Sequence, residues 1–158
     1  MAGRGVDVQV VFVRHGERRK GEVDPELTSA GRRMASETGG WLASRGFAPS
    51  LVLCTPTQRT RQTAEELTLM LPPAPLELRH ELPEARDDWD ALVDAMGRRL
   101  GSGAALLLVG HHPTLHFLAD TFGPLPAVVP RHNFAAALVL ERARPGWACT
   151  AVWPGRAG

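Results

Sequence analysis

The stretch at residues 8–17, VQVVFVRHGE, decides the fold. Its first six residues are almost all apolar and mostly β-branched, which predicts a strand that is covered on both faces. Arg14 and His15 follow this strand directly, and Gly16 allows a turn with positive φ and a close approach of the backbone to a ligand. A polar site is therefore expected at the carboxyl end of a buried strand.

The rest of the chain alternates short apolar strands with amphipathic helices. Further strands are expected at 50–54, 76–81 and 104–109. Helices are expected from the N-cap Thr28 to about Arg45, after Thr55-Pro56 as far as Pro72, over 89–100, and from Pro113 onward. Two late strands, 134–140 and 147–153, would form a closing hairpin. This alternation predicts an α/β fold of three layers, with a mostly parallel central sheet between helices and late strands that are free to be antiparallel.

Length and composition indicate one globular domain over residues 1–158. Hydrophobic residues make up 44% of the chain and charged residues 22%, which argues against a disordered protein. The formal net charge of +1 offers no bulk field for nucleic acid or an anionic membrane. The chain has two cysteines and no apolar stretch that approaches about 18 residues, which indicates a cytoplasmic protein. We expect it to act as a monomer without nucleic-acid or membrane partners.

Residues with phosphate-binding chemistry gather where three of the expected strands end. Arg14-His15 follows the first strand, Thr55–Arg59 follows the second, and Gly110–His112 follows the strand at 104–109. The carboxyl ends of parallel strands lie at one edge of a sheet, where α/β proteins bind ligands. Guanidinium groups and the free N–H groups of helix starts bind oxyanions. The sequence therefore predicts a phosphate pocket at this edge.

Four segments, in this order, resemble the motifs of the histidine phosphatase superfamily, also called the phosphoglycerate mutase-like family. They are Arg14–Glu17, Asp24 through Leu27-Thr28 to Gly31, Thr55–Ala64 and Val109–Pro113. The short chain, without a large inserted lid, looks most like the SixA-type protein-histidine phosphatases. The resemblance spans residues 14–113 and implies the phosphoglycerate mutase-like fold.

The resemblance also implies roles for the residues at the pocket. His15 would be the nucleophile and would form a phosphohistidine intermediate, because a neutral imidazole is a competent nucleophile near neutral pH. Arg14, Arg59 and His111 would clamp the phosphoryl oxygens, since phosphoryl transfer is stabilised mainly by position and by charge. His111 would thus take part in catalysis as well as in phosphate binding.

A general acid is expected between the third strand and the next helix. The resemblance places a carboxylate in the segment 81–88, where Glu84 is our choice and Glu81 and Asp87 are the alternatives. This acid would protonate the leaving oxygen, and it would matter less for an imidazole leaving group because the phosphoramidate bond is already labile. Further residues expected at the rim of the pocket are Glu17, Thr55, His112, Arg131 and His132.

Metal and cysteine chemistry fit the sequence less well. His112 and His116 have the i,i+4 spacing of zinc ligands on a helix, but Pro113 places His112 at or before the helix start. A cysteine phosphatase would need a Cys-x5-Arg loop, and Thr60 stands where the arginine would follow Cys54. We therefore expect neither a metal nor a cofactor.

The sequence favours a metal-independent phosphatase that acts through a phosphohistidine on His15. Its substrate is expected to be phosphohistidine in a protein or a small phosphomonoester. The alternative is a non-catalytic phosphate-binding module on the same fold. Such a module would keep the phosphate clamp formed by Arg14, Arg59 and His111 and would not turn over a substrate.

Overall fold

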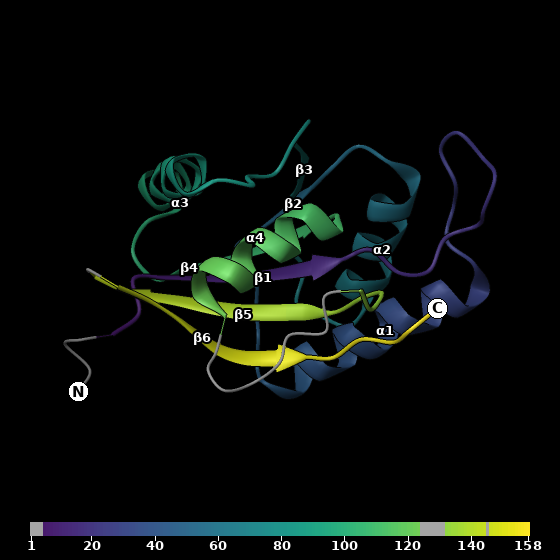
Figure 1. The fold of residues 1–158 in the computed structure, drawn as a ribbon. Helices are drawn as coiled ribbons and strands as arrows, with labels where there is room; N and C mark the ends of the chain where they lie inside the picture. The colour runs from purple at the N-terminus through teal and green to yellow at the C-terminus, as the bar shows by residue number, and fades with distance from the viewer. Residues whose placement is uncertain (1–4, 124–131, 145) are drawn as a thin grey trace.

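The computed structural model describes residues 5–123, 132–144 and 146–158 (Figure 1). These ranges hold six strands and four helices, and the strands form one sheet in the order β3-β2-β4-β1-β5-β6. No helix in these ranges has the length and apolar content that crossing a membrane requires. In chain order the elements are β1 (Val8–Arg14), α1 (Ser29–Ser44), β2 (Leu51–Cys54), α2 (Gln58–Leu69), β3 (Leu76–Leu78), α3 (Arg86–Leu100), β4 (Ala104–Gly110), α4 (His112–Phe122), β5 (Ala137–Ala143) and β6 (Gly146–Trp153).

The sheet is parallel over its first four strands and antiparallel over its last two. β1 pairs in parallel with β4, and β2 pairs in parallel with both β3 and β4. β5 runs antiparallel to β1 and forms a hairpin with β6. The predicted α/β class with antiparallel late strands is confirmed. Because β1, β2 and β4 run in the same direction, the residues that follow them lie at one edge of the sheet.

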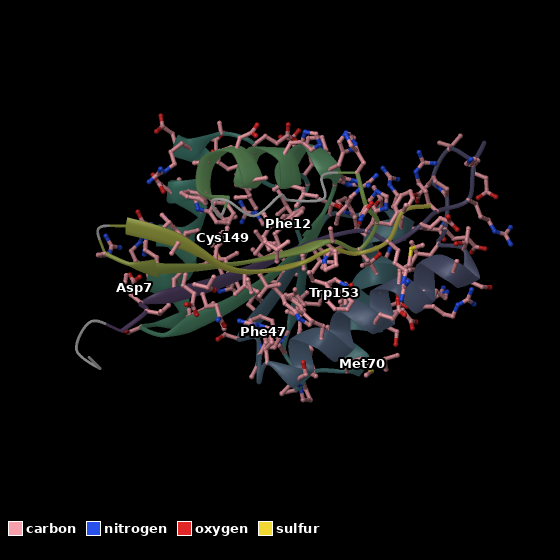
Figure 2. All side chains as sticks on the ribbon, turned by 60° about the horizontal axis from the view of Figure 1, so that its bottom comes forward. Asp7, Phe12, Phe47, Met70, Cys149 and Trp153 are labelled. Atoms are coloured by element: carbon pink, nitrogen blue, oxygen red, sulfur yellow. The ribbon has the colours of Figure 1, made fainter. Side chains whose placement is uncertain are left out.

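Alternation along the strands gives the protein one core on each face of the sheet. In β1, Phe12 packs into the core beneath α3 and α4, whereas Val11 and Val13 pack into the core beneath α1 and α2. Figure 2 shows Phe12 on one side of the sheet and Phe47 on the other. Both cores fix β1 in place, and with it the position of the residues that follow this strand.

Helices α1 and α2 pack closely against each other on one face. α1 begins at the predicted N-cap, where the Thr28 hydroxyl accepts a hydrogen bond from the Gly31 N–H at 2.9 Å. Glycine inside a helix lowers stability by about 1 kcal/mol relative to alanine, yet α1 contains Gly39. A methyl group on Gly39 would lie 3.1 Å from the carbonyl oxygen of Leu67 in α2. Gly39 therefore lets the two helices approach each other.

The third strand is shorter than the sequence predicts. β3 pairs with β2 only through Leu76–Leu78, because β2 ends at Cys54 and offers no further residues for the ladder. The Arg79 N–H still donates to the Cys54 carbonyl at 2.9 Å, and the chain then leaves the sheet. Arg79 and His80, which the predicted strand included, are therefore loop residues.

The strand β5 begins later than predicted, at Ala137 instead of Phe134. The residues before it turn across the end of β1, where the Ala135 N–H donates to the His15 carbonyl at 3.1 Å. Ala135 has a φ of 55°, which is the left-handed region that L-residues other than glycine seldom adopt. A turn at this place cannot continue the ladder, so the strand starts after it.

Candidate active site

Two histidines meet at the edge where β1 and β4 end. Arg14 and Gly110 are partners at the end of the β1–β4 ladder, and the His15 N–H donates to the Gly110 carbonyl at 3.0 Å. The rings of His15 and His111 therefore emerge beside each other, with centroids 5.6 Å apart and planes at 63°. The structure brings these two predicted residues together.

The surroundings of His15 keep its imidazole neutral and oriented. The residue is 4% exposed, and its Nδ1 lies 2.8 Å from the carbonyl oxygen of Gly16. Because a carbonyl oxygen only accepts, Nδ1 carries the proton and Nε2 keeps a free lone pair. The pKa of this imidazole is lowered to about 3. Burial is the main cause, and the charges of Arg14, Arg59 and His111 add to it.

Arg14 is held in place from the side of β5. Its Nη1 donates to the carbonyl of His132 at 2.7 Å, and its guanidinium carbon lies 4.5 Å from the centroid of the Phe134 ring. Its Nε is buried and has no hydrogen-bond partner among the described residues. Burial lowers the pKa of Arg14, and the charge of Arg18 lowers it further. A fixed guanidinium with an unpaired buried donor is suited to bind an anion.

Arg59 reaches the same place from the first turn of α2. This helix is capped by Thr57, whose hydroxyl accepts from the Thr60 N–H at 3.3 Å. The Nε of Arg59 is also buried, with no partner in the described part of the chain. Burial lowers the pKa of Arg59, and the charge of Arg18 again lowers it further. Guanidinium groups whose charge is disfavoured by burial and by like charges are stabilised when a dianion binds between them.

His111 is the N-cap residue of α4 and belongs to a chain of hydrogen bonds. Its Nε2 lies 3.0 Å from the Thr55 hydroxyl, which donates to the hydroxyl of Thr60 at 2.9 Å. Nε2 of His111 therefore donates, and its Nδ1 accepts from Arg59 at 3.5 Å. Burial, with the charge of Arg59, lowers the pKa of His111 to about 4. To donate to a phosphoryl oxygen, Nδ1 must gain a proton, which a nearby dianion favours.

The turn after His15 packs directly against the start of α1. A methyl group on Gly16 would overlap the carbonyl oxygen of Gly31, and one on Gly31 would overlap the carbonyl oxygen of Glu17. The positive φ expected at Gly16 is not found. Close backbone packing, not a left-handed turn, is therefore what requires glycine at these two positions.

Side chains of the motif at 55–64 fasten this turn to α2. The Gly16 N–H donates to the Thr63 hydroxyl at 3.0 Å, and that hydroxyl donates to the Arg59 carbonyl at 2.7 Å. The Gln62 side chain accepts from the Leu27 N–H at 2.7 Å. Sequence reasoning gave these residues no role beyond the motif. Their bonds hold the turn that follows His15 against the helix that carries Arg59.

The residues before β5 and near the C-terminus complete the support of the site. Phe134 and Arg156 exchange two backbone hydrogen bonds, at 2.8 and 3.0 Å. The Thr38 hydroxyl donates to the Ala135 carbonyl at 2.8 Å, and the Phe134 ring lies 6.0 Å from the ring of His15. These residues were missed by sequence reasoning, because no local pattern signals contacts between such distant parts of the chain.

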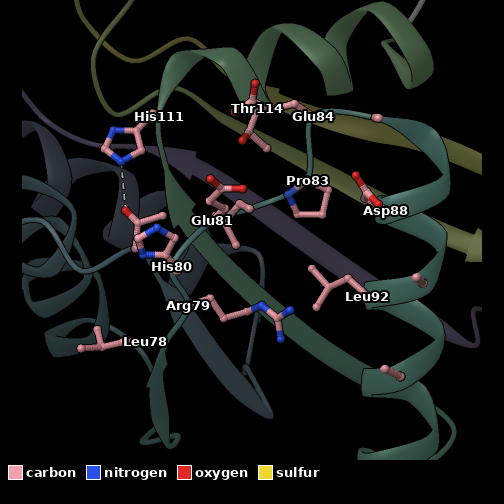
Figure 3. Close-up of a pocket in the computed structure, with 15 residues that line it drawn as sticks. Leu78, Arg79, His80, Glu81, Pro83, Glu84, Asp88, Leu92, His111 and Thr114 are labelled. Carbon is pink, nitrogen blue, oxygen red and sulfur yellow. Dashed lines mark hydrogen bonds between the residues drawn. The ribbon is translucent and has the colours of Figure 1, made fainter.

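A cavity of about 1180 Å³ opens beside His111, between the segment that follows β3 and helix α3 (Figure 3). The predicted acid Glu84 and its alternative Glu81 both line this cavity, as does Thr114 (Figure 3). Asp87, the other alternative, is not among the lining residues. The structure thus places two of the three candidate acids on the wall of a cavity that His111 also lines.

The other predicted rim residues take different places. One carboxylate oxygen of Glu17 accepts from the hydroxyl of the α1 N-cap residue at 2.8 Å. The ring of His112 lies 5.4 Å from that of His116, which lies 5.5 Å from that of His132. Arg131 falls outside the described residues. Thr55 is buried and acts on His111 through the hydrogen bond described above.

Neither a metal centre nor a reactive thiol is found at the site in the part of the chain that the structure describes. No group of three or more His, Cys, Asp or Glu side chains there is placed to hold a metal ion. His112 is the first residue of α4, with Pro113 next to it. Burial raises the pKa of the Cys54 thiol to about 11, which disfavours the thiolate that a cysteine nucleophile requires.

Several solved structures share this fold. A protein of Agrobacterium tumefaciens assigned as a phosphohistidine phosphatase SixA is 24% identical, with a TM-score of 0.71 over 93% of this chain and 97% of that chain. The protein histidine phosphatase SixA in complex with tungstate is 22% identical, with a TM-score of 0.73 over 91% and 95% of the two chains. A mutant phosphoserine phosphatase from Entamoeba histolytica, in complex with phosphoserine, is 13% identical, with a TM-score of 0.61 over 92% and 96%.

The family to which the chain belongs is shown by its sequence. A comparison with curated proteins found no significant match. The family model of the histidine phosphatase superfamily (branch 1), however, matches residues 10–100, which is more than half of the chain. This segment includes most of β1, His15 directly after it, and the first turn of α2 with Arg59. The chain therefore belongs to branch 1 of the histidine phosphatase superfamily.

Proposed function

We propose that this protein is a metal-independent phosphatase that forms a phosphohistidine on His15 and hydrolyses phosphohistidine in proteins or small phosphomonoesters. The state of His15 carries this proposal, since the ring is buried, neutral and bonded through Nδ1 to a backbone carbonyl. Its Nε2 can attack a phosphorus atom without first losing a proton. Arg14 and Arg59 supply positive charge beside it.

The proposed reaction consists of two displacements at phosphorus. In the first, Nε2 of His15 attacks, the bond from phosphorus to the leaving oxygen or nitrogen breaks, and the leaving atom takes a proton from the acid. In the second, water attacks phosphorus, the N–P bond breaks, and a proton of the water returns to the acid. The Gly16 carbonyl accepts from Nδ1–H throughout and so stabilises the positive charge of the phosphorylated ring.

Arg14 and Arg59 would act mainly by stabilising the negative charge of the transferred phosphoryl group. Arg14 and Arg59 each present a buried Nε without a partner among the described residues, in addition to their terminal nitrogens. Removal of one such preorganised donor typically costs about 2.7–4 kcal/mol of transition-state stabilisation. The bound dianion would also raise the pKa of His111, so that this ring gains a proton and becomes a third donor.

The acid is assigned to Glu84, with Glu81 as the alternative. Both line the cavity that reaches His111. A phosphomonoester needs this proton more than a phosphohistidine does, because the phosphoramidate bond is already labile. Loss of the acid should therefore slow hydrolysis of phosphomonoesters more than hydrolysis of phosphohistidine.

Similarity to SixA proteins supports phosphohistidine in proteins as a substrate class. This chain covers 97% and 95% of the lengths of the two SixA structures described above. One of them holds tungstate, a tetrahedral oxyanion of the same shape as phosphate. The arrangement of His15, Arg14, Arg59 and His111 is suited to such an anion.

A non-catalytic phosphate-binding module is the second candidate. One observation favours it: neither Glu84 nor Glu81 makes a hydrogen bond to another described residue. Neither acid is therefore held at a fixed distance from the clamp. Such a module would bind phosphate or vanadate and would turn over no substrate.

Hydrolysis of an aryl phosphate by the wild type and by His15→Ala separates the two candidates. The assay is run with and without a chelator, which should not change the activity of a metal-independent enzyme. Turnover in the wild type that disappears in His15→Ala supports the enzyme. Activity retained in His15→Ala, or activity lost to the chelator and restored by zinc, overturns the proposal. Vanadate binding without turnover in either protein establishes the module.

A further inference from the structure

The cavity beside His111 is placed to receive the part of the substrate that leaves. Thr55 and His111 are among the residues that line it, so the cavity borders the proposed phosphate clamp at His111. Its walls are formed by residues 78–85 and by α3, and its volume is about 1180 Å³. Pockets that bind small ligands usually measure roughly 300–1000 Å³. A group attached to a clamped phosphoryl therefore has ample room directly beside the clamp.

The carboxylates on the wall of this cavity are unpaired within the described part of the chain. Neither a hydrogen bond nor an ion pair joins Glu81, Glu84 or Asp88 to any described residue, although the charge of Glu84 acts on His112. Some carboxylates elsewhere are paired, such as Asp94, which accepts from Arg142 at 2.8 Å, and Glu37, which accepts from Arg156 at 2.7 Å. Since the described fold does not use the three carboxylates of the wall for ion pairs, they are available to a ligand.

The two ends of the site carry opposite charge. Arg14 and Arg59 line the clamp, and the charge of Arg18 acts on both of them. On the cavity wall, the fixed formal charges are those of the three carboxylates and of Arg79, which gives one positive charge against three negative ones. Figure 3 shows Glu81, Glu84 and Asp88 along this wall. A substrate with a negative phosphoryl and a positive leaving group matches this pattern.

We propose that this cavity selects phosphorylated substrates whose leaving group carries an ammonium or guanidinium group near the scissile bond. The proposal rests on the phosphatase function proposed above and adds a substrate class to it. Carboxylates on the wall attract a cationic leaving group and repel one that bears a carboxylate. The discrimination acts through charge, and added salt weakens it.

Two phosphomonoesters of nearly equal size test the proposal. Phosphoethanolamine has a positive leaving group and phosphoglycolate a negative one. The kcat/KM for each is divided by that for p-nitrophenyl phosphate, whose nitrophenyl group carries neither charge. The wild type is expected to prefer phosphoethanolamine, and the preference is expected to shrink as salt is added.

A pair of neighbouring aspartates provides a matched control. Asp87 and Asp88 both lie in the first turn of α3, where a carboxylate stabilises the helix, but only Asp88 lines the cavity. Asp88→Asn is expected to lower the preference for phosphoethanolamine by about two- to fivefold, the effect of one exposed charge pair. Asp87→Asn should leave the preference unchanged, although it removes a carboxylate that stabilises the helix in the same way.

A second pair of variants leaves all carboxylates intact. One variant adds a positive charge to the wall, and the other is its uncharged control. Ala91 lines the cavity from α3 and is exposed. Ala91→Lys is expected to lower the preference for phosphoethanolamine at least as much as Asp88→Asn. Ala91→Gln, which has similar bulk and no charge, should retain it.

The outcomes separate this proposal from the function on which it rests. Absence of aryl phosphate turnover in the wild type overturns the phosphatase function itself. With that turnover intact, a wild type that prefers phosphoglycolate, or a preference that neither Asp88→Asn nor Ala91→Lys changes, overturns only the role of the cavity. A preference that falls in both variants and persists in both controls establishes it.

Discussion

Nη2 of Arg59 lies 3.5 Å from Nδ1 of His111, although the first residue belongs to the start of α2 and the second caps α4. These helices follow β2 and β4, which are parallel neighbours in the sheet. The contact exists because both strands end at the same edge. The sheet therefore brings Arg59 and His111 together, and ligand binding does not have to do so.

Arg59→Lys is predicted to lower kcat/KM for an aryl phosphate by about 10²–10³, the usual effect of losing one preorganised donor. An ammonium cannot reproduce the two-nitrogen fork or the buried Nε–H. Arg61→Lys is the control, since Arg61 is exposed on the same helix. Steady-state kinetics of both variants measure the difference. Equal activity of the two variants would show that Arg59 is an ordinary surface charge.

The depressed pKa of His15 predicts a loss of stability in acid. The folded protein holds this ring at a pKa of about 3, whereas the unfolded chain binds the proton near its ordinary value of about 6.5. Between these values the unfolded state binds more protons, so the free energy of unfolding falls as pH is lowered from about 6.5. Denaturant unfolding at pH 7 and pH 5 measures this loss.

His15→Asn is the matched variant for this measurement. It should lose less stability than the wild type between pH 7 and pH 5, by on the order of 1–2 kcal/mol. His111 remains in both proteins, and its pKa is also lowered, to about 4. The variant therefore still loses some stability in acid, but less than the wild type. Identical losses in the two proteins would contradict the assignment of a neutral, buried His15.

Gly31→Ala is predicted to destabilise the fold by about 1–3 kcal/mol, the range for overpacking, and to lower activity. The added methyl group would overlap the carbonyl oxygen of Glu17, in the turn that follows His15. Gly40→Ala tests the same change in the same helix, where the nearest atom would be 3.7 Å away on Met70. Thermal melting and aryl phosphate turnover are measured for both. A Gly31→Ala protein as stable and active as Gly40→Ala would refute the close packing.

Gly155→Ala is predicted to lower kcat/KM by about ten- to a hundredfold, the effect of misplacing a catalytic group by about 1 Å. Gly155 has a φ of 65°, and a methyl group there would overlap the carbonyl oxygen of Phe134. Movement of Phe134 would disturb the ring and the neighbouring carbonyl that hold Arg14.

Gly146→Ala is the control for Gly155→Ala, because no atom lies within 4 Å of the added methyl group. Inorganic phosphate binding is measured beside kcat/KM, since a purely structural defect would not weaken phosphate binding in protein that remains folded. Unchanged phosphate affinity in folded Gly155→Ala would mean that the C-terminal residues do not position Arg14.

The sequence predicts those parts of the site that depend on strand direction. A buried run such as 104–109 reads as a strand from its own residues, and parallel strands bring their ends to one edge. The meeting of His15 and His111 follows from these two facts alone. Glu81 and Glu84 do not follow from strand direction: the family resemblance is what implies a carboxylate between the third strand and the next helix.

Other features depend on contacts that no local pattern encodes. β3 stops at Leu78 because its partner β2 ends, which is a property of the neighbouring strand. The overlap that excludes a methyl group from Gly16 arises in α1. The carbonyl that holds Arg14 is supplied by His132, a residue chosen as a rim candidate for its side chain. Each of these features depends on residues that are distant in the sequence.

Trapping of the covalent intermediate tests the central claim most directly. The wild type is mixed with excess aryl phosphate, quenched in alkali within one turnover to preserve phosphohistidine, digested and examined by mass spectrometry. The account predicts one phosphoryl group on the peptide that contains His15, formed and lost at rates that match turnover, and none in His15→Ala. A phosphoryl group on another residue of an active enzyme, or full turnover in His15→Ala, would contradict it.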